Sequence, residues 1–400
     1  MTPPRGLSLG IDLGTTRVKA ILMDADGATV ALASSTHGLD RVADGIQADP
    51  LTWWNSTCAA LAALALEHPL THVAAVGLSG NMSALVLVDE QLCPVAPALL
   101  LADERGAAEI GALDAEVLER IVRTTGNRPS TVFTLSSLLW WSRNDGAVLA
   151  RAAAALSAKD YLRARLTGRL ATDLTDAFNS LVVGGQGWDH GLIAELGLPS
   201  ELFPTILTSD AVAGQVSPSA AAETGLPAGT PVVTGSGDVA AALAGGGGLA
   251  DDELAVSLGT SVTLMAPIPS GPGAPAPAGL TRHPASDGSW FLLGSLLTGG
   301  LALNWMRGLF GADAIAAASD IPDADDPILF LPYLAGTGSP GRGPLGLVEQ
   351  AGGHSHHIGD DLRPRGDLRP ASGERQGGEL CSGARTDLLD QERQVERNCL

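Results

Sequence analysis

A short pattern that occurs twice places the strongest constraint on how this chain can fold. Residues 8–22 run from an apolar segment through Leu-Gly-Thr-Thr into a second segment with alternating apolar side chains. Residues 253–267 repeat this order around Leu-Gly-Thr-Ser. Each copy predicts two strands joined by a Gly/Thr turn. A repeat at this separation is typical of a duplicated architecture that is built twice on the same hairpin.

Strand and helix patterns alternate between the two copies. Residues 50–67 carry apolar side chains at helical spacing, and residues 72–80 return to a strand pattern. The alternation continues to about residue 245, which favours an α/β fold. A length of 400 residues with 45% hydrophobic side chains is enough for two domains, each with its own core.

Charge and sequence pattern exclude several classes of function. The formal net charge is −20 without any Lys/Arg-rich run, which opposes binding to nucleic acid. The sequence shows neither a secretory leader nor an apolar run long enough to span a membrane, so we expect no membrane association. The four cysteines lie far apart and form no CxxC pair, which favours a reducing cytoplasm: Cys58, Cys93, Cys381 and Cys399.

Asp12 is the first candidate for chemistry, because it ends an apolar strand directly before the turn Gly14-Thr15-Thr16. Glycine lets a phosphate approach the backbone N–H groups, and the two hydroxyls add further donors. Asp12 would then hold Mg²⁺ beside the phosphates. The alternative interpretation is a simple hairpin turn that is capped by threonine.

The second turn, Gly259-Thr260-Ser261, has the same donors in the same strand setting. Two such hairpins that face each other across a cleft would bind a nucleoside triphosphate from both sides. The pair of turns therefore favours phosphate binding more strongly than either turn alone.

Asp238 is the candidate general base. It follows an apolar strand and a Gly-Ser-Gly turn, and it precedes a helix of small residues. A carboxylate at such a helix start can accept the proton of a hydroxyl while a phosphoryl group is transferred. The alternative is an ordinary aspartate N-cap, which is common at helix starts.

The chain resembles the FGGY carbohydrate kinases, and within them the xylulokinase branch. The resemblance covers roughly residues 7–343, where several motifs match in order and spacing. The matching segments are GIDLGTTRVKAILMD, SGNMSALVLVDE, LLLADERGAAE, SAKDYLRARLTGRLATDLTDA, TGSGDVAAALAGGG, SLGTS and LFLPYLAGTGSP.

The resemblance implies duplicated actin-like (ribonuclease H-like) ATPase domains around a central cleft. Residues 1–242 would form the N-terminal domain with the sugar and phosphate sites. Residues 243–345 would begin the C-terminal, nucleotide-binding domain, and residues 346–400 would be a divergent, poorly ordered tail. This tail departs from the family's pattern, in which a long helical segment and an adenine-binding loop follow, so a loss of ATP binding is an open alternative.

The resemblance also implies roles for individual residues. Asp238 would deprotonate the sugar hydroxyl, and Asp12 would position Mg²⁺. The residues implied to bind ATP are Gly14, Thr15, Thr16, Lys19, Gly259, Thr260, Ser261 and Gly300. The residues implied to contact the sugar, together with Asp238, are Asn81, Met82, Ser83, Asp103 and Arg105.

Two departures bear on the substrate. Glycerol kinases carry an Arg-Glu pair where this chain has Met82-Ser83, which disfavours glycerol. Xylulokinases usually have Met-His there and a polar amide after the catalytic aspartate, where this chain has Val239. D-Xylulose is the expected substrate, with another ketose or a polyol as the alternative. A second alternative is a sugar-binding or regulatory protein without activity, and the expected assembly, if the chain associates, is a homodimer.

Overall fold

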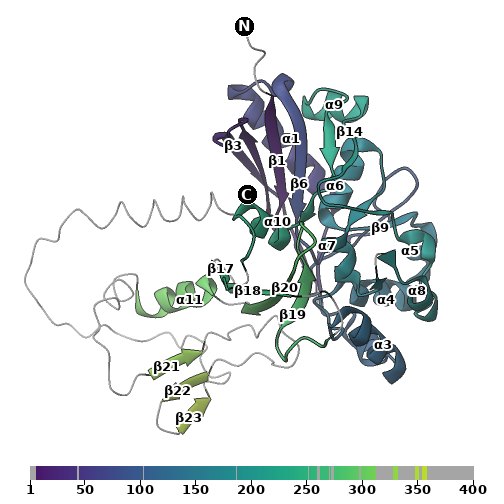
Figure 1. The fold of residues 1–400 in the computed structure, drawn as a ribbon, viewed down its shortest axis with the longest axis vertical. Coiled ribbons are helices and arrows are strands. Elements are labelled where there is room, and N and C mark those ends of the chain that lie inside the picture. The colour runs from purple at the N-terminus through teal and green to yellow at the C-terminus, as the bar shows by residue number, and fades with distance from the viewer. Residues whose placement is uncertain are drawn as a thin grey trace, which may run out of the picture.

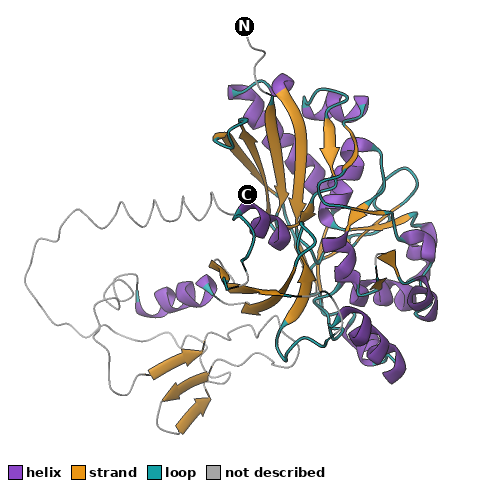
Figure 2. Cartoon of the chain, viewed as in Figure 1, coloured by secondary structure: helices purple, strands orange, loops and turns teal. Residues whose placement is uncertain are grey.

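Figure 1 shows the computed structural model of the chain, and its helices and strands mix throughout (Figure 2). The mixed α/β architecture predicted from the sequence is therefore confirmed. The duplication and the domain boundaries stay predictions. The structure describes residues 6–42, 45–101, 103–185, 187–250, 252–258, 262–269, 271, 274–296, 299–311, 328–331, 347–350 and 354–357.

The central sheet is built around the first predicted hairpin. β1 and β2 pair antiparallel with Asp12 opposite Lys19, and β6 lies parallel to β1 on its other side. The sheet order is β14-β15-β6-β1-β2-β3, and β16 also pairs with β6. Its strands are β1 (Leu7–Leu13), β2 (Arg17–Met23), β3 (Thr29–Thr36), β6 (Val73–Gly80), β14 (Val212–Gln215), β15 (Pro231–Val233) and β16 (Ser236–Gly237).

The long helix α1 (Pro50–Glu67) packs against β2 and β3, as the helical spacing predicts. Asp49 caps this helix by accepting a hydrogen bond from the backbone N–H of Leu51, which has no partner inside the helix. Trp53 and Trp54 are 2% and 3% exposed, so both belong to the core. The helices that pack on α1 are α6 (Ala158–Thr167) and α9 (Pro218–Thr224).

A second hydrophobic core lies beside the central sheet, among the helices at the right of Figure 1. Phe133, Leu135 and Leu139 are buried in it. Its helices are α2 (Ala107–Gly111), α3 (Ala115–Thr125), α4 (Thr134–Asn144), α5 (Gly146–Arg151) and α8 (His190–Glu195). The shorter elements of residues 40–207 are β4 (Asp40–Val42), β5 (Gly45–Ala48), η1 (Leu70–His72), β7 (Val86–Val88), β8 (Ala98–Leu99), β9 (Ala154–Leu156), β10 (Thr172–Asp173), α7 (Leu174–Ala177), η2 (Phe178–Ser180), β11 (Val183–Gly184), β12 (Gly187–Trp188), η3 (Ser200–Leu202) and β13 (Ile206–Leu207).

The second predicted hairpin is also an antiparallel pair, β17 with β18, and it belongs to a sheet of order β17-β18-β20-β19. This sheet is tied to the end of α3, because Asn127 Nδ2 donates to the carbonyl of Arg282 at 2.9 Å and Arg282 N–H donates to Asn127 Oδ1 at 2.7 Å. Its strands are β17 (Ala255–Leu258), β18 (Val262–Ile268), β19 (Thr281–Pro284) and β20 (Trp290–Leu296).

The remaining elements follow or precede this sheet in the chain. They are α10 (Asp238–Gly245), α11 (Gly300–Phe310), β21 (Ile328–Leu331), β22 (Leu347–Gln350) and β23 (His354–His357). The last three strands form one antiparallel sheet. Among the described helices, none is both long and apolar enough to cross a membrane.

Candidate active site

The candidate site lies where three parallel strands end together. β1, β6 and β16 are aligned so that Asp12 lies beside Ser79, and Ser79 lies beside Ser236. Because parallel strands point in one direction, their carboxyl ends meet at one edge of the sheet, where α/β proteins commonly bind ligands. Asp12 and the start of α10 at Asp238 are thereby brought together, although they are far apart in the sequence.

Asp12 is partly buried and oriented by its strand neighbour. Ser79 Oγ donates a hydrogen bond to Asp12 Oδ1 at 2.7 Å. Burial raises the pKa of the Asp12 carboxyl above its usual value, while the Ser79 hydrogen bond and the charge of Lys19 oppose this rise. Lys19 lies opposite Asp12 on β2, so the sheet register keeps a cation near the carboxylate.

Asp238 has the properties of a general base. Burial, with the nearby charge of Asp12 as the next cause, raises the pKa of Asp238 to about 7. A base whose pKa lies near the working pH can both accept and release a proton. The N-cap of α10 is Gly237, and Asp238 is the first helical residue, with Oδ1 accepting from the Val239 N–H at 2.8 Å. The aspartate N-cap alternative is therefore wrong.

The first Gly/Thr turn is held by backbone contacts. The Gly14 N–H donates to the carbonyl of Arg17, and the His37 N–H donates to the carbonyl of Thr16, both at 3.0 Å. The side chains of Thr15 and Thr16 are exposed. The turn thus leaves two hydroxyls open beside Asp12, which suits the predicted phosphate contact but does not test it.

The residues expected to contact the sugar follow β6 directly. The Asn81 N–H donates to the carbonyl of Leu13 at 3.0 Å, which fixes this segment to the end of β1. Met82 packs on Gly237, because a Cβ atom at Gly237 would lie 2.3 Å from Met82 Cγ. Met82 therefore lies next to the residue that precedes Asp238.

Asp103 and Arg105 engage each other. Arg105 Nη2 lies 2.8 Å from Asp103 Oδ2, and the same oxygen accepts the Ile46 N–H at 2.9 Å. The Arg105 guanidinium also lies over the ring of Trp140, 4.9 Å from its centroid. Through these contacts the pair joins the segments that carry Ile46 and Trp140. That the pair contacts the sugar stays a prediction.

The predicted nucleotide residues of the second domain are placed only in part. Gly300 is the first residue of α11, whose N-cap is Gly299. The turn Gly259-Thr260-Ser261 lies outside the described residues.

A buried cluster of charged side chains, centred on Lys159, was not predicted from the sequence. Lys159 Nζ lies within 2.9 Å of carboxylate oxygens of Asp160, Asp173 and Asp176, and its side chain is fully buried. Arg163 adds a second cation, 2.6 Å from Asp160. The available signal was the set of charged side chains within α6, since buried charges are rare unless they are paired.

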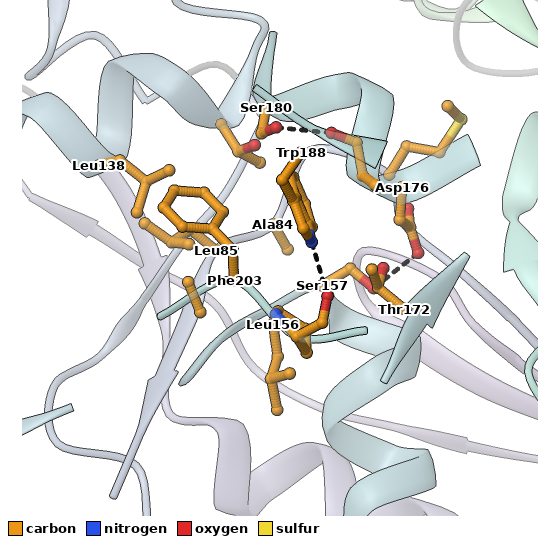
Figure 3. Close-up of a pocket in the computed structure, with 15 residues that line it drawn as sticks. Ala84, Leu85, Leu138, Leu156, Ser157, Thr172, Asp176, Ser180, Trp188 and Phe203 are labelled. Atoms are coloured by element: carbon orange, nitrogen blue, oxygen red, sulfur yellow. Dashed lines mark hydrogen bonds between the residues drawn. The ribbon is translucent and has the colours of Figure 1, made fainter. Parts of the chain in front are cut away.

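Helix α7 connects this cluster to the candidate site by hydrogen bonding. Thr175 Oγ1 accepts the N–H of Gly237 at 2.8 Å, directly before the candidate base. Figure 3 shows Asp176 at the edge of a small cavity of about 40 Å³, where Ser157 Oγ donates to it at 2.6 Å. Burial raises the pKa of Asp176 to about 7, and the charges of Asp160 and Asp173 act in the same direction while Lys159 opposes them. Lys159 and its carboxylates thus support the turn that carries Asp238.

The site offers few metal ligands. The described residues contain no group of three or more His, Cys, Asp or Glu side chains that could hold an ion. Mg²⁺ is commonly held by one or two carboxylates together with waters and substrate phosphates. Asp12 fits this kind of site, because it is partly buried, oriented by Ser79 and close enough to Asp238 for the two charges to oppose each other.

Comparison with known proteins defines the class. Residues 7–245 match the FGGY family of carbohydrate kinases, N-terminal domain. This match covers more than half of the chain, so the chain belongs to the FGGY family of carbohydrate kinases.

Several individual relatives are named as xylulose or xyloylose kinases. The chain is 34% identical to the xylulose kinase of Klebsiella pneumoniae, over 86% of this chain and 74% of that protein. It is 33% identical to the xylulose kinase of Escherichia coli, over 86% of this chain and 73% of that protein. A crystal structure of a xyloylose kinase from Brucella ovis superimposes with a TM-score of 0.76 at 30% identity, over 90% of this chain and 74% of that one.

Proposed function

We propose that this chain transfers the γ-phosphoryl group of ATP to a hydroxyl of a sugar, with D-xylulose as the first expected acceptor and D-xylulose 5-phosphate as the product. The observation that carries the proposal is the pair Asp12 and Asp238 at the meeting point of three strand ends, with the pKa of Asp238 raised to about 7. A phosphoryl transfer needs such a base for the acceptor hydroxyl and an anion-binding turn beside it.

The roles proposed here are those implied by the resemblance to the family, and the positions of the groups support them. Asp238 accepts the proton of the sugar hydroxyl as the new O–P bond forms. Asp12 would hold Mg²⁺, which would supply positive charge to neutralise the phosphates. The turn Gly14-Thr15-Thr16 offers its N–H and O–H donors to phosphate oxygens. The duplicated actin-like arrangement, in which a second domain closes over the nucleotide, belongs to this proposal.

The choice of D-xylulose rests on the relatives, because the xylulose kinases of two bacteria are about one third identical to this chain. Ser83 and Val239 are the residues that separate this chain from the usual xylulokinase pattern, so another ketose or a polyol is the alternative acceptor. A cytoplasmic location and a homodimeric assembly stay predictions.

The test is sugar-dependent ADP release from Mg-ATP with the purified protein and a panel of ketoses and polyols. D-Xylulose is expected to give the highest kcat/KM, and Asp238→Asn is expected to lower the sugar-dependent rate by about 10²–10⁴-fold. Asp24→Asn, which replaces a partly buried carboxylate in the turn after β2 and away from the strand ends, is the matched control and should leave the rate unchanged. Sugar binding by calorimetry without any ADP release would contradict the kinase and favour a sugar-binding protein.

A further inference from the structure

Asn179 lies beneath the predicted sugar-contacting pair. It sits in the 3₁₀ turn η2 and is 2% exposed. Its Nδ2 donates to the carbonyl of Met82 at 2.6 Å and to Ser83 Oγ at 3.0 Å. One buried amide therefore fixes both the backbone of Met82 and the hydroxyl of Ser83.

The orientation of this amide follows from chemistry. A backbone carbonyl can only accept a hydrogen bond, so the group that faces the Met82 carbonyl at 2.6 Å must be the NH₂ end of Asn179. The same NH₂ group then donates its second hydrogen to Ser83 Oγ. Ser83 is an acceptor in this contact, and its own hydroxyl hydrogen is left over.

Ser83 is the member of this segment that is accessible to a bound molecule. Asn81 and Met82 are 6% and 8% exposed, whereas Ser83 is only partly buried. The Ser83 N–H is also engaged, because it donates to Asn81 Oδ1 at 3.3 Å. The group that Ser83 can offer to a bound molecule is thus chiefly a hydrogen-bond donor.

The support under Asn179 is rigid. Ser180 Oγ donates to the Ala177 carbonyl at 2.6 Å within the same turn. The preceding helix α7 begins at its N-cap Asp173, whose side chain accepts from the N–H groups of Thr175 and Asp176. Asp173 is itself held by Lys159 at 2.9 Å. The amide of Asn179 therefore has little freedom to turn away from Ser83.

We propose that Asn179 is a positioning residue that makes Ser83 a hydrogen-bond donor toward the substrate, and that this site consequently prefers sugars with an acceptor-only carbonyl oxygen. A ketose carbonyl can only accept, whereas the matching polyol presents a hydroxyl whose hydrogen needs an acceptor of its own. The inference rests on the proposed function, since it names the substrate class of the same site.

The test compares kcat/KM for D-xylulose with kcat/KM for its reduced counterpart xylitol. Ser83→Ala and Asn179→Ala are each expected to lower the ketose-to-polyol ratio about two- to tenfold, the size of one neutral hydrogen bond. Because Asn179 acts through Ser83, the double variant should lower the ratio no further than Ser83→Ala alone. Ser8→Ala removes an exposed hydroxyl at the far end of β1, away from this turn, and should leave the ratio unchanged.

An equal loss on both substrates in Asn179→Ala, additive with Ser83→Ala, would overturn the inference and leave Asn179 a purely structural residue. If Asn179→Ala does not fold, Asn179→Ser replaces it, since a hydroxyl can donate only one hydrogen bond. If the unmodified chain turns over no sugar, the kinase proposal fails by itself. The same ratio is then measured in dissociation constants by calorimetry, where an unchanged ratio in the variants overturns the inference and a lowered ratio supports it.

Discussion

Two groups of carboxylates lie close to the same turn, and they differ in how their charge is balanced. In the buried cluster, Lys159 contacts three carboxylates, and Arg163 contacts one of them. Although burial opposes it, the two cations hold the pKa of Asp160 well below its usual range. At the strand ends, burial and the charge of Asp12 push the pKa of Asp238 upward.

The difference separates a structural role from a functional one. Carboxylates with a cation in contact stay ionised and fix the backbone around them. Carboxylates that repel each other at an open edge attract a divalent cation and bind protons near neutral pH, as a kinase site requires. Asp176 lies between the two cases, since it contacts Lys159 and yet its pKa is raised to about 7.

The largest effect is expected from removing the buried cation. Lys159→Met should lower the free energy of unfolding by about 3–5 kcal/mol, because buried carboxylates lose their main partner. Lys19→Met, which removes the cation opposite Asp12, is the matched control and should cost far less. Urea unfolding followed by circular dichroism measures both. Equal losses in the two variants would remove the distinction between the two regions.

The same substitution in the two regions should give opposite results. Asp238→Asn should lower kcat by about 10²–10⁴-fold, the contribution of a general base, with unfolding free energy unchanged or raised. Asp160→Asn should lower the unfolding free energy, because Lys159 and Arg163 lose a buried partner. Steady-state ADP release and urea unfolding are measured on both variants. A fully active Asp238→Asn would contradict the assignment of the base.

The strand ends were predictable because local sequence specifies them. The Gly/Thr turn, the helix at residues 50–67 and the strand-turn-helix around Asp238 each follow from a contiguous pattern, and the structure has all three. The resemblance to the FGGY kinases placed Asp12 and Asp238 in one site. The sheet register brings both to one edge, while their catalytic roles stay predictions.

The supporting contacts could not be predicted, because they join distant segments. Asn179 reaches Met82 across 97 positions of sequence, and Thr175 reaches Gly237 across 62. The local sequence around each of these residues does not predict which distant residue it contacts. Lys159 and Asp160 are buried by the packing of α6 against the sheet, which also depends on segments far apart in the sequence.

A smaller effect, on the pH dependence of activity and stability, is expected when the charge of Asp12 beside Asp238 is removed. Since Asp238 must be ionised to act as the base, kcat/KM should rise as pH increases through about 7. Its effect on stability has the opposite sign, because a raised carboxyl pKa gives stability that is present below the usual 3.8 and is lost as pH rises through about 7.

Asp12→Asn should move the midpoint of the kcat/KM profile and the midpoint of the stability profile to lower pH. Neither midpoint should reach the ordinary carboxyl pKa, since burial is the larger cause of the raised pKa of Asp238. Carbon-13 NMR titration of the Asp238 carboxyl measures the shift independently of activity. Ser8→Asp, a new charge on an exposed residue at the far end of β1, is the control and should leave the midpoint in place. An unchanged midpoint in Asp12→Asn would show that the two carboxylates do not interact.

The smallest effect is expected at Ser79, which holds Asp12 at the site edge. Ser79→Ala removes the hydrogen bond at 2.7 Å that lowers the pKa of Asp12, so that pKa should rise further. The unfolding free energy should change by about 1 kcal/mol, the net worth of one hydrogen bond, and the KM for Mg-ATP should rise a fewfold. Ser8→Ala, which removes an exposed hydroxyl from β1, should change none of these three quantities. A rise in the sugar KM instead would place Asp12 on the sugar side of the site and not on the phosphate side.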